Sequence, residues 1–162
     1  MLFRSSKPNT TWCIDFTYLP MKNTKFRYNC TIIDLYNRSV VASVNSNKID
    51  TNLAIKTVQE GLKNIIVTKL IIHSDQGSQF TSKQFNIFCT RNNLIQSMSR
   101  KGKPCDNSPM ERYYNTLKNE YYNLYEFSCI EKVDEGIKQF NLKYNYERPH
   151  TFNGGIPPRL VK

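Results

Sequence analysis

The chain has 162 residues and a mass of 19.0 kDa, which is enough for one domain with a substantial core and too little for two. Its content of 39% hydrophobic and 22% charged residues is typical of a folded domain and excludes a disordered tail. The net charge of +10, from 23 Lys and Arg against 13 Asp and Glu, favours a polyanionic partner, most commonly nucleic acid.

No part of the sequence indicates a membrane span or a secretion signal. The longest apolar runs, such as residues 70–72, are much shorter than a span requires, and residues 1–10 contain no apolar stretch. The cysteine spacing contains no CxxC pair, which disfavours a zinc site and fits reduced thiols at Cys13, Cys30, Cys89, Cys105 and Cys129. We therefore expect a cytoplasmic protein that does not contact a membrane.

The first third of the chain is predicted to form three strands. Residues 1–10 are polar and basic and are interpreted as a leader or linker. From Trp12 to Leu19 apolar and polar side chains alternate, which is the pattern of a strand with one buried face. Two further β-rich runs, 25–36 and 39–44, follow with a short turn between them, so the three strands are expected to form an antiparallel meander.

Helices and strands alternate in the rest of the chain. A helix is expected over 50–64, capped by Asp50 or Thr51, and then a strand over 69–74, a loop over 76–82, a helix over 83–92 and a strand over 94–98. Helices over 108–122 and 130–146 follow, and the tail, 148–162, is expected to be irregular. This order predicts an α/β fold in which residues 11–147 form a five-stranded mixed sheet with helices on its faces.

Three carboxylates occupy positions where a charged side chain calls for a specific structural or functional role. Asp15 lies in the middle of a half-buried strand, where an uncompensated charge is costly. Asp75 follows a central strand, at the edge where open α/β sheets bind ligands. Glu111 lies in the first turn of a helix. Carboxylates that converge from different elements suit Mg²⁺, and two such ions can clamp both oxygens of a phosphoryl transfer.

Each of these acids also has a structural explanation. Asp15 could pair with a lysine at a strand edge, and Asp75 could form a turn with Gly77. Glu111 could complete a capping box with Ser108 as the N-cap. The spacing of the acids therefore leaves a metal site and three separate structural roles both open.

Basic residues gather in the same half of the chain, at Arg91, Arg100, Lys101, Lys103, Arg112 and Lys118. Helical spacing places Asn115, Lys118 and Tyr122 on the same face as Glu111. Lys118 can then contact a DNA phosphate near the reacting one, or it can be a solvated surface lysine. A carboxylate pocket rimmed by cations is typical of a metal-dependent enzyme that acts on nucleic acid.

Five signatures in order along the chain carry a family resemblance; they are residues 8–18, 73–80, 102–111, 117–120 and 144–150. The first contains Trp12-Cys13-Ile14-Asp15, the second His73-Ser74-Asp75, and the third Asn107-Ser108-Pro109-Met110-Glu111. Together they resemble the integrase core of DDE transposases, and most of all bacterial insertion-sequence transposases made from two overlapping reading frames. The resemblance implies a ribonuclease H-like fold.

The resemblance also implies an activity and a set of roles. It makes Asp15, Asp75 and Glu111 the catalytic triad, which binds two Mg²⁺ or Mn²⁺ ions. Water then cleaves the end of the element, and the 3′-hydroxyl released attacks another DNA strand. His73, Gly77 and Asn107 are expected to shape the site, and DNA contacts are expected from Arg100, Lys101, Lys103, Arg112 and Lys118.

The implied partners are DNA, as terminal repeats and target, a second copy of the chain in the active complex, and an upstream helix-turn-helix region in a partner or fusion. We expect the protein to lie on the nucleoid when it is bound to DNA. Two other hypotheses remain at this point. One is a ribonuclease H-type nuclease, and the other is a truncated transposase that binds DNA or full-length transposase without activity of its own.

Overall fold

The structure, a computed structural model, describes residues 5–22, 25–63, 65–66, 69–100 and 107–162. Its sheet contains five strands in the order β3-β2-β1-β4-β5. Their bounds are β1 Thr11–Pro20, β2 Phe26–Asp34, β3 Val40–Ser46, β4 Leu70–Ser74 and β5 Leu94–Met98. The first three strands pair antiparallel, whereas β4 pairs parallel with both β1 and β5. The predicted five-stranded mixed sheet is confirmed.

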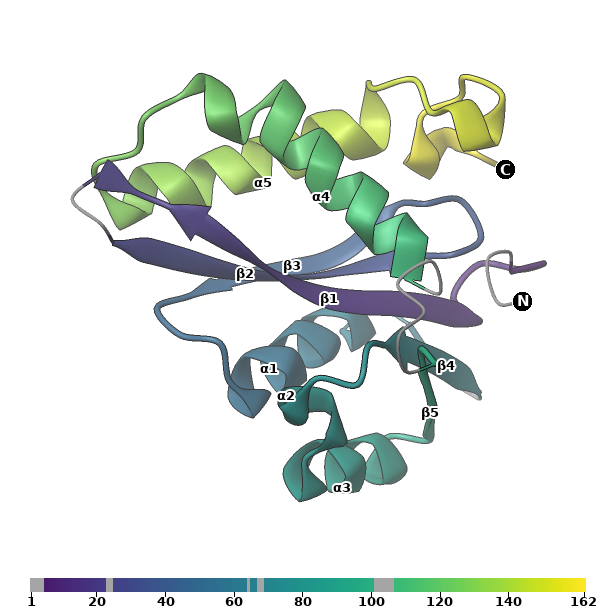
Figure 1. The fold of residues 1–162 in the computed structure, drawn as a ribbon. Helices are drawn as coiled ribbons and strands as arrows, with labels where there is room; N and C mark the ends of the chain where they lie inside the picture. Colours follow the sequence, from purple (N-terminus) through teal and green to yellow (C-terminus); the bar gives the residue numbers. More distant parts are fainter. Residues whose placement is uncertain (1–4, 23–24, 64, 67–68, 101–106) are drawn as a thin grey trace.

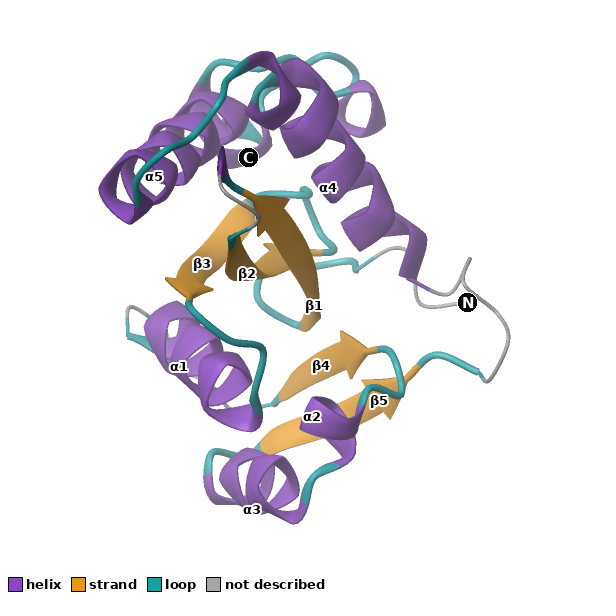
Figure 2. Cartoon of the chain, turned by 60° about the vertical axis from the view of Figure 1, so that its left-hand side comes forward, coloured by secondary structure: helices purple, strands orange, loops and turns teal. Residues whose placement is uncertain are grey.

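Helices cover both faces of the sheet (Figures 1 and 2). One face carries α4 (Ser108–Glu120) and α5 (Ile130–Tyr146), and the other carries α1 (Thr51–Leu62), α2 (Ser78–Thr81) and α3 (Lys83–Arg91). Short 3₁₀ helices follow at Tyr122–Leu124, Thr151–Asn153 and Pro158–Leu160. In the part of the chain that the structure describes, no helix is both long enough and apolar enough to cross a membrane.

The alternation of side chains along β1 creates two cores. Cys13 and Leu19 pack under α4 and α5, whereas Trp12 and Ile14 face the opposite way and pack with side chains of α1 and α3. All four of these side chains are at most 1% exposed. β1 is the central strand, and the half-buried Asp15 lies on it directly after the fully buried Ile14.

Three local expectations need correction. The predicted loop over 76–82 contains the one-turn helix α2, because Phe80 is fully buried and its amide bonds to the Gly77 carbonyl. The capping box is wrong, since Asn107 is the N-cap of α4, Ser108 is already helical, and the Asn107 side chain makes no cap hydrogen bond. Tyr122 is wrongly placed on the Glu111 face, because α4 ends at Glu120 and the Tyr122 hydroxyl donates to the Pro20 carbonyl.

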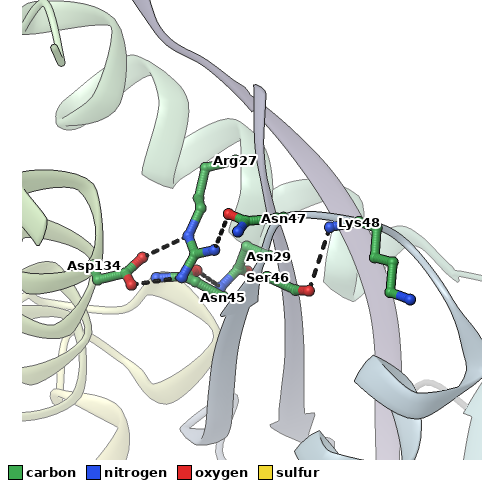
Figure 3. Close-up of polar contacts among 7 residues, drawn as sticks. All are labelled: Arg27, Asn29, Asn45, Ser46, Asn47, Lys48 and Asp134. Atoms are coloured by element: carbon green, nitrogen blue, oxygen red, sulfur yellow. Dashed lines mark hydrogen bonds and ion pairs between the residues drawn. The ribbon is translucent and has the colours of Figure 1, made fainter. Parts of the chain in front are cut away.

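A polar cluster joins β2 to α5 (Figure 3). Arg27 donates from Nε and Nη2 to the two carboxylate oxygens of Asp134, at 2.9 and 2.6 Å, and from Nη1 to Asn47 Oδ1 at 2.6 Å. The Arg27 side chain is 11% exposed and the Asp134 side chain 37%, so the guanidinium is better shielded from water than the carboxylate. Such a pair stabilises the docked position of α5 more than an exposed ion pair would.

We expect Asp134→Asn to lower the free energy of unfolding by about 1–2 kcal/mol, because the buried guanidinium loses its charged partner. Glu135→Gln removes the same charge one residue away, at an exposed position, and is expected to change stability by less than about 0.5 kcal/mol. Urea unfolding of the two variants measures the difference. Equal effects would show that the bidentate pair adds nothing to a surface charge.

Candidate active site

The pairing of β1 with β4 determines where two of the three predicted acids lie. Cys13 pairs with His73 in the parallel register, and Asp15 and Asp75 are each two residues further along their strands. Asp75 is the first residue after β4, whereas Asp15 is still inside β1. The sheet therefore carries both carboxylates to the same edge, at the carboxyl end of β4.

Two residues of the α4 region hold Asp15. Asn107 donates from Nδ2 to Asp15 Oδ2 at 2.8 Å, and the buried Tyr114 hydroxyl donates to the Asp15 carbonyl at 2.6 Å. The Phe16 amide donates to the other carboxylate oxygen, Oδ1, at 2.7 Å. These contacts fix both the backbone and the side chain of Asp15, so its carboxylate is held in one orientation.

The charges of Asp75 and Glu111 both affect the pKa of Asp15. The pKa of Asp15 is raised to about 7; burial is the largest cause, and the negative charges of Asp75 and Glu111 act in the same direction. The hydrogen bonds from the Phe16 amide and Asn107 act in the opposite direction. A carboxyl group with these neighbours resists ionisation unless a positive charge joins the site.

Asp75 is exposed, and its local geometry depends on Gly77. The Gly77 amide donates to Asp75 Oδ1 at 2.8 Å, so the turn considered from sequence is present. A Cβ at Gly77 would lie 2.9 Å from that same oxygen. Because Gly77 has no side chain, the Asp75 carboxylate can lie against the Gly77 backbone amide.

Gly77→Ala is expected to displace the Asp75 carboxylate, because a contact of 2.9 Å is too short for a Cβ. If Asp75 is catalytic, the variant should lose about tenfold to a hundredfold in DNA cleavage rate. Its thermal unfolding should change little, since Asp75 is at the surface. A steady-state cleavage assay and a melting curve measure the two effects, and wild-type activity in Gly77→Ala would contradict a role for the Asp75 geometry.

His73 stabilises the end of the two parallel strands. Its ring nitrogens lie 3.0 Å from Ser97 Oγ and 3.2 Å from Ser99 Oγ, and the ring is buried. Gln76 adds a hydrogen bond from Nε2 to the Ser99 carbonyl at 3.0 Å. These contacts tie the segment that carries Asp75 to the end of β5, so His73 acts on the position of Asp75.

The remaining predicted residues that the structure describes differ in exposure. Glu111 and Arg112 are exposed on the first turns of α4, Lys118 is partly exposed further along it, and Arg100 is exposed just after β5. Lys101 and Lys103 lie outside the described residues. Within the ranges given above, no three His, Cys, Asp or Glu side chains are close enough together to hold a metal ion.

One polar atom beside the acids has no partner. Asn107 is 6% exposed, and its Oδ1 accepts no hydrogen bond from any described residue, although its Nδ2 is bound to Asp15. A buried acceptor left in this way is costly, so it marks a place where a hydrated ligand fits. Tyr114 is a second contact of Asp15 that the sequence does not reveal, because a buried tyrosine gives no signal of what its hydroxyl binds.

A five-stranded mixed sheet with Asp15 and Asp75 at one edge is the architecture expected of an integrase core. The chain belongs to the integrase core domain family, whose models match residues 5–104 and 92–158. Among its relatives are the transposase for insertion sequence element IS904 of Lactococcus lactis subsp. lactis (strain IL1403), 36% identical over 152 residues, and the putative transposase InsK for IS150 of Escherichia coli (strain K12), 29% identical over 157 residues. The aligned regions cover 93% and 96% of this chain, but 60% and 55% of the relatives. The chain thus spans little more than half of their length. The predicted resemblance to insertion-sequence transposases is confirmed, and the origin from two overlapping reading frames stays a prediction.

Solved structures share the fold. The catalytic core domain of HTLV-2 integrase in complex with magnesium, in its trimeric form, superposes with a TM-score of 0.79 over 98% of this chain and 99% of that one, at 21% identity. The simian T-cell lymphotropic virus intasome, in complex with the PP2A regulatory subunit B56 gamma, gives a TM-score of 0.85 at 18% identity, over 98% of this chain and 55% of that chain. The predicted ribonuclease H-like fold is therefore confirmed.

Proposed function

We propose that this chain is the catalytic core of a DDE transposase, which cleaves a DNA strand at the end of a mobile element and joins the resulting 3′-hydroxyl to another strand. The observation that carries the proposal is the parallel register of β1 and β4, which brings Asp15 and Asp75 to the same sheet edge. Glu111, on α4, lies near enough for its charge to raise the pKa of Asp15. Membership of the integrase core domain family supports the same conclusion.

The residues at this edge fit a divalent cation. Three carboxylates are hard oxygen donors of the kind that suit Mg²⁺ or Mn²⁺, and the unpartnered Asn107 Oδ1 can accept a hydrogen bond from a hydrated ion. Asp15, Asp75 and Glu111 would hold the two proposed ions, which when bound neutralise charge on the scissile phosphate and activate water. The carboxylates repel one another in the metal-free protein, so we propose that they close up only on binding.

Other residues of the chain position the acids and the DNA. Asn107 and Tyr114 keep Asp15 oriented, and the Gly77 amide does the same for Asp75. The cations Arg100, Arg112 and Lys118 contact DNA phosphates in this proposal, as do Lys101 and Lys103. Phosphate contacts of this kind hold a duplex in register without reading its sequence.

The partners are proposed on the same basis. The HTLV-2 integrase core is known in dimeric and trimeric forms, and the simian virus neighbour is an intasome. We propose that this chain likewise acts on DNA as a homo-oligomer, on terminal repeats and target in the cytoplasm, with an upstream helix-turn-helix region supplying end recognition.

The direct test is a strand-cleavage assay with the purified chain, a labelled DNA duplex and Mn²⁺. We expect nicked and strand-transfer products that depend on the metal and are absent from Glu111→Gln, since Gln preserves the size of the side chain and removes its charge. Two results would overturn the proposal. Faster cleavage of an RNA–DNA hybrid would identify a ribonuclease H-type nuclease. DNA binding without products, even after the upstream region is restored, would identify an inactive remnant.

A further inference from the structure

A groove of about 810 Å³ begins beside Glu111 and runs between the outer face of α4 and the segment that follows α5. Its walls come from distant parts of the sequence: Arg38 from the turn between β2 and β3, Arg112 and Asn119 from α4, and Arg148 and Phe152 from the segment beyond α5. Figure 1 shows this C-terminal segment, in yellow, beyond the end of α5. The groove therefore begins beside Glu111, the one candidate acid in its lining, and extends along α4.

Guanidinium groups dominate its charge. Arg112 is exposed and has no ion-pair partner among the described residues, whereas Arg148 is paired with Glu120 through contacts of 2.6 and 2.5 Å. The Arg38 guanidinium lies 4.0 Å from the centre of the Phe152 ring. Against these three cations stand the carboxylates of Glu111 and Glu120, so the lining carries a small net positive charge.

The rest of the lining suits nucleotides better than a simple anion. The exposed amide side chains of Asn115 and Asn119 and the partly exposed hydroxyl of Thr116 lie on the α4 wall. The partly exposed ring of Phe152, in the segment after α5, also lines the groove, whereas Tyr144 is 3% exposed and belongs to the core. Guanidinium groups bind phosphodiesters, amides bind base edges, and aromatic rings stack on bases, a combination typical of single-strand binding.

We infer that this groove binds an unpaired stretch of DNA continuous with the strand whose phosphate lies at the acids. The inference rests on the proposed function for the location of that phosphate. It adds a site that the acids do not provide, with Arg112, Arg148 and the two asparagines as its contacts. A strand held there keeps the bases beyond the reacting bond apart from their complement.

The test compares the affinity of two labelled DNAs by fluorescence anisotropy without divalent metal. One is a blunt duplex, and the other carries a short single-stranded overhang. Thr116→Glu places a negative charge in the groove, and Asn119→Asp does so with almost no change in shape. Thr90→Glu is the matched control, since Thr90 and Thr116 both donate to the carbonyl four residues earlier in an α-helix, at 3.0 and 2.9 Å, and Thr90 lies on α3.

We expect wild type and Thr90→Glu to bind the overhang DNA more tightly than the blunt duplex. Both groove variants should bind the overhang DNA about tenfold more weakly than wild type. Circular dichroism checks that each variant is folded. The inference fails if wild type binds the two DNAs equally, or if Thr90→Glu loses as much as Thr116→Glu. Metal-dependent nicking of the blunt duplex by wild type separates the two proposals. Nicking without an overhang preference refutes only the groove, and a preference without nicking, even after the upstream region is restored, refutes only the proposed function.

Discussion

Asp75→Asn is expected to lower the rate of metal-dependent DNA cleavage by at least about a thousandfold. The substitution keeps the size of the side chain and its ability to accept the Gly77 amide, and it removes only the charge. Because Asp75 is exposed, the loss cannot be traced to the core. Cleavage of a labelled duplex in Mn²⁺, with thermal unfolding in parallel, measures both properties.

Asp50→Asn provides the control for this experiment. Asp50 caps α1 by accepting the Leu53 amide at 2.8 Å, and asparagine caps a helix about as well. The variant loses the same charge away from the acid edge and should cleave at the wild-type rate. If Asp75→Asn retains activity, or if both variants lose it equally, then Asp75 has the structural role of a turn residue and the acid triad is wrong.

The metal-free protein should lose stability as the pH rises from about 4 to about 7, because of Asp15. Its pKa in the folded chain is about 7, against an ordinary 3.8, so the folded state binds a proton that the unfolded state has already released. The stabilisation that protonated Asp15 contributes is therefore fully present below pH 4 and is lost as the pH rises through 7. The difference amounts to about 2–4 kcal/mol, depending on how far solvent screens the site.

Asp15→Asn isolates this effect from other groups that titrate. His150 opposes it, since burial lowers the pKa of that ring to about 4 and its contribution is lost as the pH falls from 6.5 to 4. From pH 5 to pH 8, the melting temperature of Asp15→Asn should rise by several degrees relative to that of wild type. Mg²⁺ should stabilise wild type alone at pH 8. A difference that does not change with pH would show that Asp15 ionises normally.

The strands of the sheet could be predicted from the sequence, because the pattern that defines each strand lies within a few consecutive residues. Alternation along 12–19 predicted β1, the apolar run at 70–72 predicted β4, and their polar residues Asp15 and Asp75 could be recognised as out of place. A parallel pairing of these strands then carries both acids to one edge. Nothing beyond side-chain periodicity and strand order was required.

The errors arose where a side chain binds far along the chain. Ser108 is a residue type that often caps helices, but the N-cap of α4 is Asn107, and the Asn107 side chain binds Asp15 instead of the helix. Local patterns cannot reveal that competition. The groove was missed for the same reason, since Arg38, Arg112 and Arg148 come together only in the folded protein.

The contacts that orient Asp15 also determine how late in protein synthesis the site can form. Asn107 and Tyr114 lie 92 and 99 residues after Asp15, so a ribosome-bound chain can contain the whole sheet while its first acid still lacks both partners. Proteins are made from the N-terminus, and long-range contacts of this kind form last. A chain interrupted before α4 would therefore carry Asp15 and Asp75 but would lack both side chains that hold Asp15 in position.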